Sequence, residues 1–480
     1  MEKIGCEGCL LSQAPYILTF MTTSDLGWAE TLLAGTGVSP ARAAHLAAGG
    51  APGDATEAAV APALVAGWAA AAGVDPATVI ADEGSVELFD LGVRLRAAVT
   101  GTLQHRLAHR VAVGDWPLVA VSLADDRGEV AFTVERPGQA PVSGSVEVAL
   151  GALGVTLPAG NGPAPVGECL VVASRAHLHR LVAAAEAVAE GGPYEVAAAR
   201  VSWWGQRAEH PGSAAVVVVP DACRQRWATG GDPAAEAAVG TWAGWLGLGG
   251  GSRPTTALLG AAAALRAGRL LPALDDAVRG SGKVEPGRES DDAGAWGAFV
   301  AARKGNRRWR GGDSALSAAI GLRSRSDAAE FWERALLEDP LWALRGRFAG
   351  RVVAATVESM AGASALRLVT TQAACRFRPG SKVVLRTADA SLKAELASIA
   401  MSGDGRLVID VETARTARLH LTVGQRVEMV SEPVSMGRMV SARVNVAERF
   451  SFPAWARDRT PAPRIRREIP LDVMVAASED

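Results

Sequence analysis

The sequence predicts a chain of the α/β (or α+β) class, in which an alanine-rich N-terminal part precedes a small antiparallel β-barrel at the C-terminal end. Three observations lead to this prediction. Helical patterns dominate residues 39–112, and over 86–112 apolar residues recur every three or four positions, which is typical of a helix that buries one face. The run 214–219 is apolar on both faces, as in a central strand of an α/β layer. After Gly350, short alternating segments are separated by Gly, Asp, Ser and Pro, as in a barrel or sandwich.

The length of 480 residues predicts about two to four domains. A polar stretch that mixes Gly, Lys, Glu, Pro, Ser and Asp over residues 280–292 is the preferred boundary between two of them. The expected organisation is a mainly helical region (1–115), an α/β region (116–285), a basic helical connector (286–347), the β-barrel (348–434) and an extended arginine-rich tail (435–480).

Helices dominate the beginning of the chain. Ser39 and Asp54 are N-cap candidates for helices over residues 40–48 and 58–72, and apolar spacing predicts a third helix over 86–112. The best membrane-spanning candidate, within 58–74, is mostly alanine and shorter than the ~20 strongly apolar residues that a bilayer requires. We therefore expect no membrane span.

The α/β region alternates between predicted strands and helices. Its strands are expected over residues 117–123, 130–134, 145–157, 170–173, 194–204 and 214–219, with a helix over 175–190.

Further strand patterns fill the predicted barrel. They cover residues 352–357, 366–370, 382–387, 394–400, 407–411, 419–421 and 426–430. Six or seven short strands in about 80 residues are typical of a small antiparallel barrel.

Charge is distributed unevenly along the chain. Residues 301–480 hold 29 Lys and Arg against 20 Asp and Glu, a net charge of +9, whereas residues 1–300 hold 20 against 31, a net charge of -11. Such asymmetry indicates a part that binds polyanions, or a pair of surfaces that attract each other.

The densest basic cluster precedes the barrel and contains five cations around one tryptophan. It consists of Arg303, Lys304, Arg307, Arg308, Trp309 and Arg310. These residues could neutralise phosphates while the indole stacks on a base, or they could form a solvated basic loop. Arg376, Arg378 and Lys382 extend the positive charge into the barrel, and we include them in the candidate nucleic-acid surface.

Other candidate sites have weaker patterns. Asp221 follows the buried run 214–219, where α/β nucleases and hydrolases often place a carboxylate, but a helix-capping aspartate is the alternative. Cys6 and Cys9 have the spacing of half a zinc site, without a second pair to complete it. The cysteines are few and scattered, which favours reduced thiols. With no membrane span expected, we expect a cytoplasmic protein of bacterial type. We expect no cofactor.

A resemblance covers about a fifth of the chain. Its features are Gly350-Arg351-Val352-Val353, the stretch from Phe377 to Leu385, Val423-Gly424-Gln425-Arg426-Val427, and Ser435-Met436-Gly437-Arg438-Met439 with Phe450. They resemble the 1B barrel of up-frameshift-type superfamily 1 helicases and the exit from that barrel. The resemblance implies that the barrel lies against single-stranded nucleic acid. No Walker A sequence follows Phe450, so we do not expect the chain to be a helicase itself.

Together these features predict an accessory nucleic-acid-binding protein without its own ATPase motor. Its expected partners are DNA or RNA and a separate helicase or ATPase subunit. Two alternatives remain open, namely an α/β nuclease or hydrolase centred near Asp221 and a protein-interaction scaffold within a larger complex.

Overall fold

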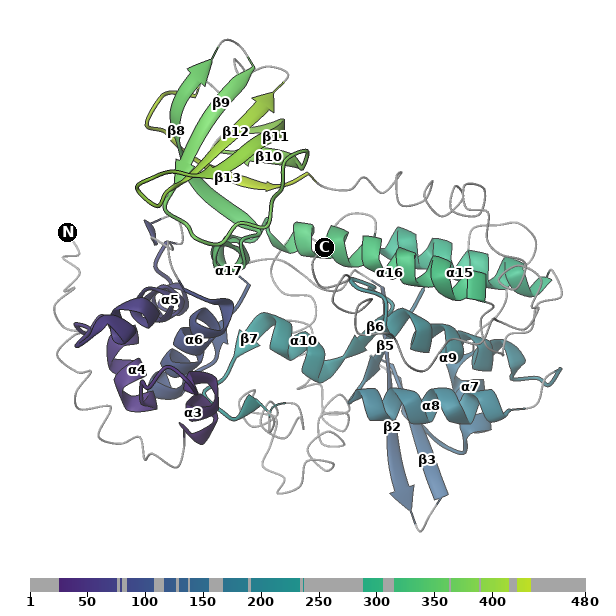
Figure 1. Cartoon of the computed structure of the whole chain (residues 1–480). Coiled ribbons are helices and arrows are strands. Elements are labelled where there is room, and N and C mark those ends of the chain that lie inside the picture. The colour runs from purple at the N-terminus through teal and green to yellow at the C-terminus, as the bar shows by residue number, and fades with distance from the viewer. Residues whose placement is uncertain are drawn as a thin grey trace, which may run out of the picture.

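The computed structural model confirms the mixed α/β class and the C-terminal antiparallel barrel. It describes residues 26–75, 78–79, 84–107, 116–126, 129–136, 139–154, 167–188, 191–233, 236, 288–304, 315–361, 364–387, 390–413 and 421–432. Figure 1 shows a helical unit, an α/β layer and the barrel, with helix α16 extending from the α/β layer toward the barrel.

The helical unit contains the first described elements of the chain. They are α3 (Gly27–Leu33), α4 (Pro40–Ala47), α5 (Ala55–Ala71) and α6 (Val86–Thr100). Polar residues cap three of these helices, because the side chains of Ser39, Asp54 and Ser85 each accept a hydrogen bond from a backbone N–H three residues later. Ser39 and Asp54 are thus confirmed as N-caps.

Two glycines bring α5 and α6 into close contact. A Cβ atom on Gly67 would lie 2.1 Å from the carbonyl oxygen of Phe89, and one on Gly92 would lie 2.3 Å from that of Leu64. Each glycine therefore faces the backbone of the other helix, and a larger side chain would keep the two helices apart.

The α/β layer is built on a five-stranded sheet of order β4-β3-β2-β5-β6. Its strands are β2 (Leu118–Asp126), β3 (Glu129–Glu135), β4 (Val142–Gly144), β5 (Cys169–Val172) and β6 (Val216–Val218). Strands β2, β5 and β6 are parallel, and β3 and β4 are added in antiparallel fashion. All four residues of β5 are buried, as expected of a central strand.

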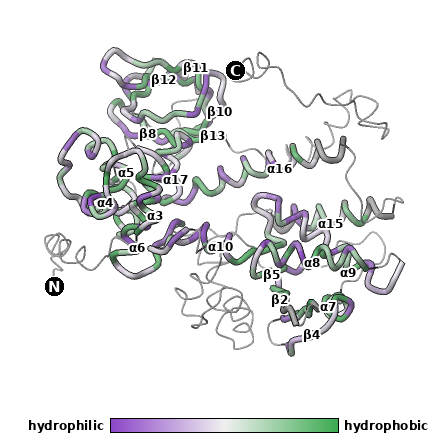
Figure 2. Tube along the Cα trace, turned by 60° about the horizontal axis from the view of Figure 1, so that its bottom comes forward, coloured by the Kyte–Doolittle hydropathy of each residue, from purple (hydrophilic) through white to green (hydrophobic). Residues whose placement is uncertain are grey.

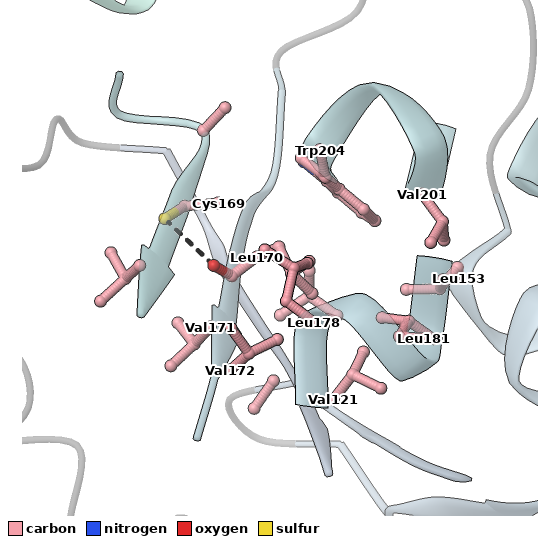
Figure 3. Close-up of a cluster of buried hydrophobic side chains, with 14 of the residues drawn as sticks. Val121, Leu153, Cys169, Leu170, Val171, Val172, Leu178, Leu181, Val201 and Trp204 are labelled. Atoms are coloured by element: carbon pink, nitrogen blue, oxygen red, sulfur yellow. Dashed lines mark hydrogen bonds between the residues drawn. The ribbon is translucent and has the colours of Figure 1, made fainter. Parts of the chain in front are cut away.

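Three helices pack against this sheet and against one another. They are α7 (Val146–Leu153), α8 (Arg175–Ala187) and α9 (Glu195–Ala208). Figure 3 shows Leu178, Leu181 and Trp204 from these helices beside Leu170 and Val172 of the sheet. This is the largest buried apolar cluster among the described residues.

Two predicted strands of this region are helices. The strand predicted over 145–157 is replaced by α7, and the one predicted over 194–204 lies almost wholly in α9. The first segment is rich in Ala and Leu and the second in Ala and Arg, residues that favour helices. Of the valines that suggested strands, Val201 is buried in its helix whereas Val148 is exposed. The strand predicted over 214–219 is confirmed as β6, which is shorter because a helix begins at Val219, with Pro220 in its first turn.

Short elements connect the helical unit to the α/β layer. Helix α10 (Val219–Arg226) follows β6 and leads into β7 (Trp227–Ala228), which pairs with β1 (Gln104–His105). The pairing places β1 and β7 beside α6 (Figure 1).

Helix α15 (Arg288–Lys304) packs on α9. The buried carboxylate of Asp292 binds the guanidinium of Arg207 and accepts a hydrogen bond from the backbone N–H of Ala214 at 2.7 Å. Trp296 adds to a cage of three indole rings, with those of Trp203 and Trp204, around the buried guanidinium of Arg200.

Helices α16 (Ala315–Leu336) and α17 (Pro340–Phe348) lead to the barrel. Arg345 of α17 binds both carboxylate oxygens of Asp90 in α6 at 3.0 Å, and the rings of Phe348 and Phe89 lie 5.4 Å apart. The barrel is therefore held against the helical unit through α17. In Figure 2, hydrophobic and hydrophilic positions alternate along α16, as they do in the barrel.

The barrel is closed in the order β10-β11-β12-β9-β8-β13, with β10 and β13 also paired. Its strands are β8 (Val352–Ala361), β9 (Ala365–Thr370), β10 (Lys382–Arg386), β11 (Ser391–Met401), β12 (Leu407–Thr413) and β13 (Arg426–Ser431). Every pair is antiparallel. Inward-facing Val, Leu, Ile and Met side chains fill the interior.

None of the helices in the described ranges combines the length and the apolar character needed to cross a bilayer.

Candidate nucleic-acid interface

The candidate interface is the connection between β9 and β10 together with the first residue of β10. We call residues 374–382 the basic segment. Along it, Cys375 and Phe377 are half-buried against the barrel core, whereas Arg376 and Arg378 are exposed. The alternation turns the guanidinium groups to solvent because the neighbouring side chains are packed inward. Lys382, also exposed, begins β10.

Backbone contacts hold the basic segment in place. The buried side-chain nitrogen of Gln372 lies 2.9 Å from the carbonyl oxygen of Arg347, 2.8 Å from that of Val352 and 2.7 Å from that of Ala374. The backbone N–H of Arg376 donates to the carbonyl of Gly350 at 3.0 Å. These bonds join the segment to α17 and β8, so its course is defined by the barrel.

Gly350 is required at this contact. Its φ of +67° suits glycine, and a Cβ there would lie 3.0 Å from the backbone of Ala374 and Cys375. A tight turn follows farther along the segment, where Arg378 and Ser381 exchange hydrogen bonds and Gly380 donates to the carbonyl of Leu396.

Most other cations of the barrel strands are neutralised by carboxylates. Arg367 binds Asp410 at 2.8 Å, Arg406 binds Asp404 at 2.6 Å, and Lys393 binds Glu432. Arg351 and Arg386 also have acidic partners, in Glu333 and Glu338 respectively. By contrast, no acidic partner is found within the described ranges for Arg376, Arg378, Lys382 or Arg426.

A further arginine adds to the positive charge of the basic segment. Burial and the nearby charge of Arg376 together lower the pKa of Arg351 from its ordinary value. The two guanidinium groups therefore repel each other, and Glu333 offsets only one of them. A polyanion placed here would relieve that repulsion.

The densest basic cluster of the sequence cannot be added to this surface. Arg303 and Lys304 end helix α15, and their side chains lie outside the described residues. Also outside the described residues lie Arg307, Arg308, Trp309, Arg310, Cys6 and Cys9.

Asp221 lies in the first turn of α10, just beyond the carboxyl end of β6. Its Oδ2 accepts from Nε of Arg175 at 2.8 Å, and its Oδ1 accepts from Nη2 of Arg224 at 2.9 Å. Both carboxylate oxygens of Asp221 are therefore engaged by guanidinium groups. Within the described ranges, no group of three or more His, Cys, Asp or Glu side chains is placed to hold a metal ion.

The surroundings of Asp221 include residues that the sequence did not single out. Arg175, Glu209 and His210 share a cavity with Asp221, as do Trp332 and Trp342 from α16 and α17. The position of Arg175 directly after a predicted strand was the available signal, since the carboxyl ends of neighbouring parallel strands meet at one edge. Nothing in the sequence indicated that the two tryptophans would approach it.

No known family model matches the chain, and no curated protein matches it with significant similarity.

Proposed function

We propose that this chain binds nucleic acid, DNA or RNA, through a surface that includes the basic segment. We further propose that it does so in the cytoplasm as the accessory partner of a separate helicase or ATPase. One observation supports the binding proposal above the others. Arg376, Arg378 and Lys382 are exposed, close in sequence and without acidic partners among the described residues, whereas most other cations of the barrel are paired.

Cations of this kind suit a phosphate backbone. Each contact with a phosphate releases condensed counterions, which supplies free energy that depends on salt concentration. A carboxylate already bound to an arginine offsets part of its charge and occupies some of its N–H groups. The three unpaired side chains can therefore contribute to binding more fully than Arg367 or Arg406.

The anchoring of the basic segment also favours binding. Gln372 and Gly350 fix the backbone, so association would order the cationic side chains but not the chain that carries them. A smaller loss of conformational entropy leaves more of the interaction energy available for affinity.

The association with a helicase or ATPase depends on the resemblance of the barrel sequence to that of the helicase 1B barrels. In that family the barrel lies beside single-stranded nucleic acid. The closed six-stranded barrel is compatible with the resemblance, although many unrelated proteins contain small barrels.

The test compares two triple variants of the full chain that change its net charge equally. One is Arg376→Ala/Arg378→Ala/Lys382→Ala, and the control is Arg367→Ala/Lys393→Ala/Arg406→Ala, which removes three paired cations of the same barrel. Binding to fluorescent single-stranded DNA, single-stranded RNA and duplex DNA is measured by anisotropy in about 0.1 M salt.

We expect the first variant to bind the preferred nucleic acid about 100-fold more weakly, because each phosphate contact with a single strand contributes roughly fivefold at this salt concentration. The control should remain within about threefold of the unmodified chain. Equal losses in the two variants, or no binding by the unmodified chain to any of the three probes, would overturn the proposal.

A further inference from the structure

A cavity of about 570 Å³ lies between the α/β layer and the helices that lead to the barrel. Its floor includes Val216, Val217 and Val218 of β6. The cavity is also lined by α10, by the segment after α9, and by Trp332 of α16 and Trp342 of α17. The volume is in the range of small-molecule sites, roughly 300–1,000 Å³.

The position of the cavity is one that open α/β sheets use for ligands. Strands β5 and β6 are adjacent and parallel, and the residues that follow them, Arg175 and Asp221, both line the cavity. Ligands of such sheets bind beyond the carboxyl ends of the strands. Helices α8 and α10 also begin at this edge, and the positive ends of their dipoles favour a negative group there.

The charged side chains that line the cavity are three arginines, Arg175, Arg207 and Arg224, and two carboxylates, Glu209 and Asp221. Asp221 has both oxygens bound by Arg175 and Arg224, and Glu209 has one oxygen bound by Arg175 at 2.6 Å. A guanidinium has five N–H groups, of which Arg175 uses two and Arg224 uses one in these bonds. A ligand group that only accepts hydrogen bonds, such as a phosphate, matches the remaining donors.

The tryptophans add a second kind of recognition. Trp332 and Trp342 are both half-buried and line the cavity, and the guanidinium of Arg345 lies over the ring of Trp342, 4.8 Å from its centroid. Indole rings offer flat apolar surface on which a planar heterocycle can stack. Together with the valine floor, they suit a ligand with a planar ring at one end and an anion at the other.

We propose that this cavity binds a nucleoside phosphate, with its base against the tryptophans and its phosphate at Arg175 and Arg224. The ligand contacts two parts of the molecule at once, because the arginines belong to the α/β layer and the tryptophans to α16 and α17. Occupancy therefore joins the α/β layer to the helices that hold the barrel. The site is separate from the basic segment and does not depend on the nucleic-acid proposal.

The experiment is calorimetric titration of the full chain with ATP, GTP and UTP, and with adenosine and inorganic phosphate as partial ligands. We expect at least one of the nucleotides to bind, and adenosine and phosphate each to bind at least tenfold more weakly than the best nucleotide. Absence of binding by all three nucleotides at 1 mM would overturn the proposal. Inorganic phosphate that binds as tightly as the nucleotides would overturn it as well, since only an anion site would remain.

Matched variants locate the binding. Arg224→Ala should weaken nucleotide binding at least tenfold, while Arg406→Ala, an arginine of similar exposure (43% against 45%) that is also ion-paired, should leave it unchanged. Trp332→Leu should weaken nucleotide binding more than it weakens phosphate binding. Equal affinity in Arg224→Ala and Arg406→Ala would contradict the site. The Arg376→Ala/Arg378→Ala/Lys382→Ala variant should keep nucleotide affinity, so failure of one proposal is distinguishable from failure of the other.

Discussion

The crossing of α5 and α6 gives a prediction whose size follows from the structure. Gly67→Ala and Gly92→Ala would each place a methyl group against a carbonyl oxygen of the facing helix, at 2.1 Å and 2.3 Å respectively. Neither oxygen can rotate away, because both belong to helical backbone. The helices would have to separate by about 1 Å to restore ordinary van der Waals distances.

Two opposing effects set the magnitude. Overpacking of this kind costs typically ~1–3 kcal/mol, with the upper end expected when backbone must move. Replacement of glycine by alanine within a helix recovers up to ~1 kcal/mol. We expect each substitution to destabilise the helical unit by about 2 kcal/mol, which corresponds to a roughly 30-fold increase in the population of its open state.

Hydrogen exchange measured by mass spectrometry is the suitable assay, because a chain with several structural units need not unfold in one step. Peptides that cover residues 55–71 and 86–100 should exchange about 30-fold faster in either variant. Gly27→Ala is the control, since a Cβ on Gly27, in α3 of the same unit, meets nothing within 4 Å. Unchanged exchange in Gly67→Ala and Gly92→Ala would refute the close approach of the two helices.

Three further predictions concern buried ionisable groups. Burial disfavours the charged form of Asp90, but the guanidinium groups of Arg106 and Arg345 outweigh burial and hold the pKa of Asp90 below its ordinary value. These two ion pairs therefore stabilise the fold above about pH 4, and the stabilisation is lost as the pH falls through the lower pKa of the folded state. Asp90→Asn should accordingly flatten the acid limb of stability measured by urea unfolding, and an unaltered limb would contradict this. Burial raises the pKa of Cys223 to about 12, so iodoacetamide at pH 8 should leave Cys223 unmodified in the native chain, as checked by peptide mass spectrometry; rapid labelling would contradict its burial. Burial lowers the pKa of Arg200 to about 10, so Arg200 is still charged at neutral pH within its tryptophan cage. Arg200→Ala should reduce the free energy of unfolding by about 3 kcal/mol, and a reduction under about 0.5 kcal/mol would show that the cage does not stabilise the fold.

The barrel was predictable from the sequence because several of its strands, such as β9 and β11, bury alternate residues on one face. In β11, for example, exposed and buried positions alternate from Ser391 to Glu395, and the predicted strand over 394–400 lies within the observed one. Turn residues such as Gly405 and Gly424, both with positive φ, separate the strands. The two-residue hydrophobic period and the positions of the turn residues therefore indicate the same strands, so these strands can be predicted without tertiary information.

The α/β layer was less predictable, since its helices are buried on one side by the sheet. Helix α9 contains Val196, Val201, Trp203 and Trp204, and residues of these types also favour strands. Its alanines and arginines favour a helix, and packing of the tryptophans beneath α15 decides the outcome. That contact joins residues almost a hundred positions apart, so a local pattern does not reveal it.

The sequence shows which residues of the candidate interface are positively charged, but it does not show which of these cations form ion pairs with carboxylates. Arg376, Arg378 and Arg367 look alike in the sequence, and only the fold shows that Asp410 lies opposite Arg367 on the neighbouring strand. The same holds for Asp221, whose two arginines come from α8 and from its own helix. The tertiary structure therefore determines which cations remain available to a ligand.

The salt dependence of binding tests the central claim most directly. The logarithm of the association constant for the preferred single-stranded nucleic acid is plotted against the logarithm of salt concentration for the full chain and the two triple variants. The account predicts that Arg376→Ala/Arg378→Ala/Lys382→Ala makes the slope less negative by about 2, because about 0.7 counterions are released per phosphate contact, and that Arg367→Ala/Lys393→Ala/Arg406→Ala leaves it unchanged. Identical slopes for the unmodified chain and the basic-segment variant would contradict the account.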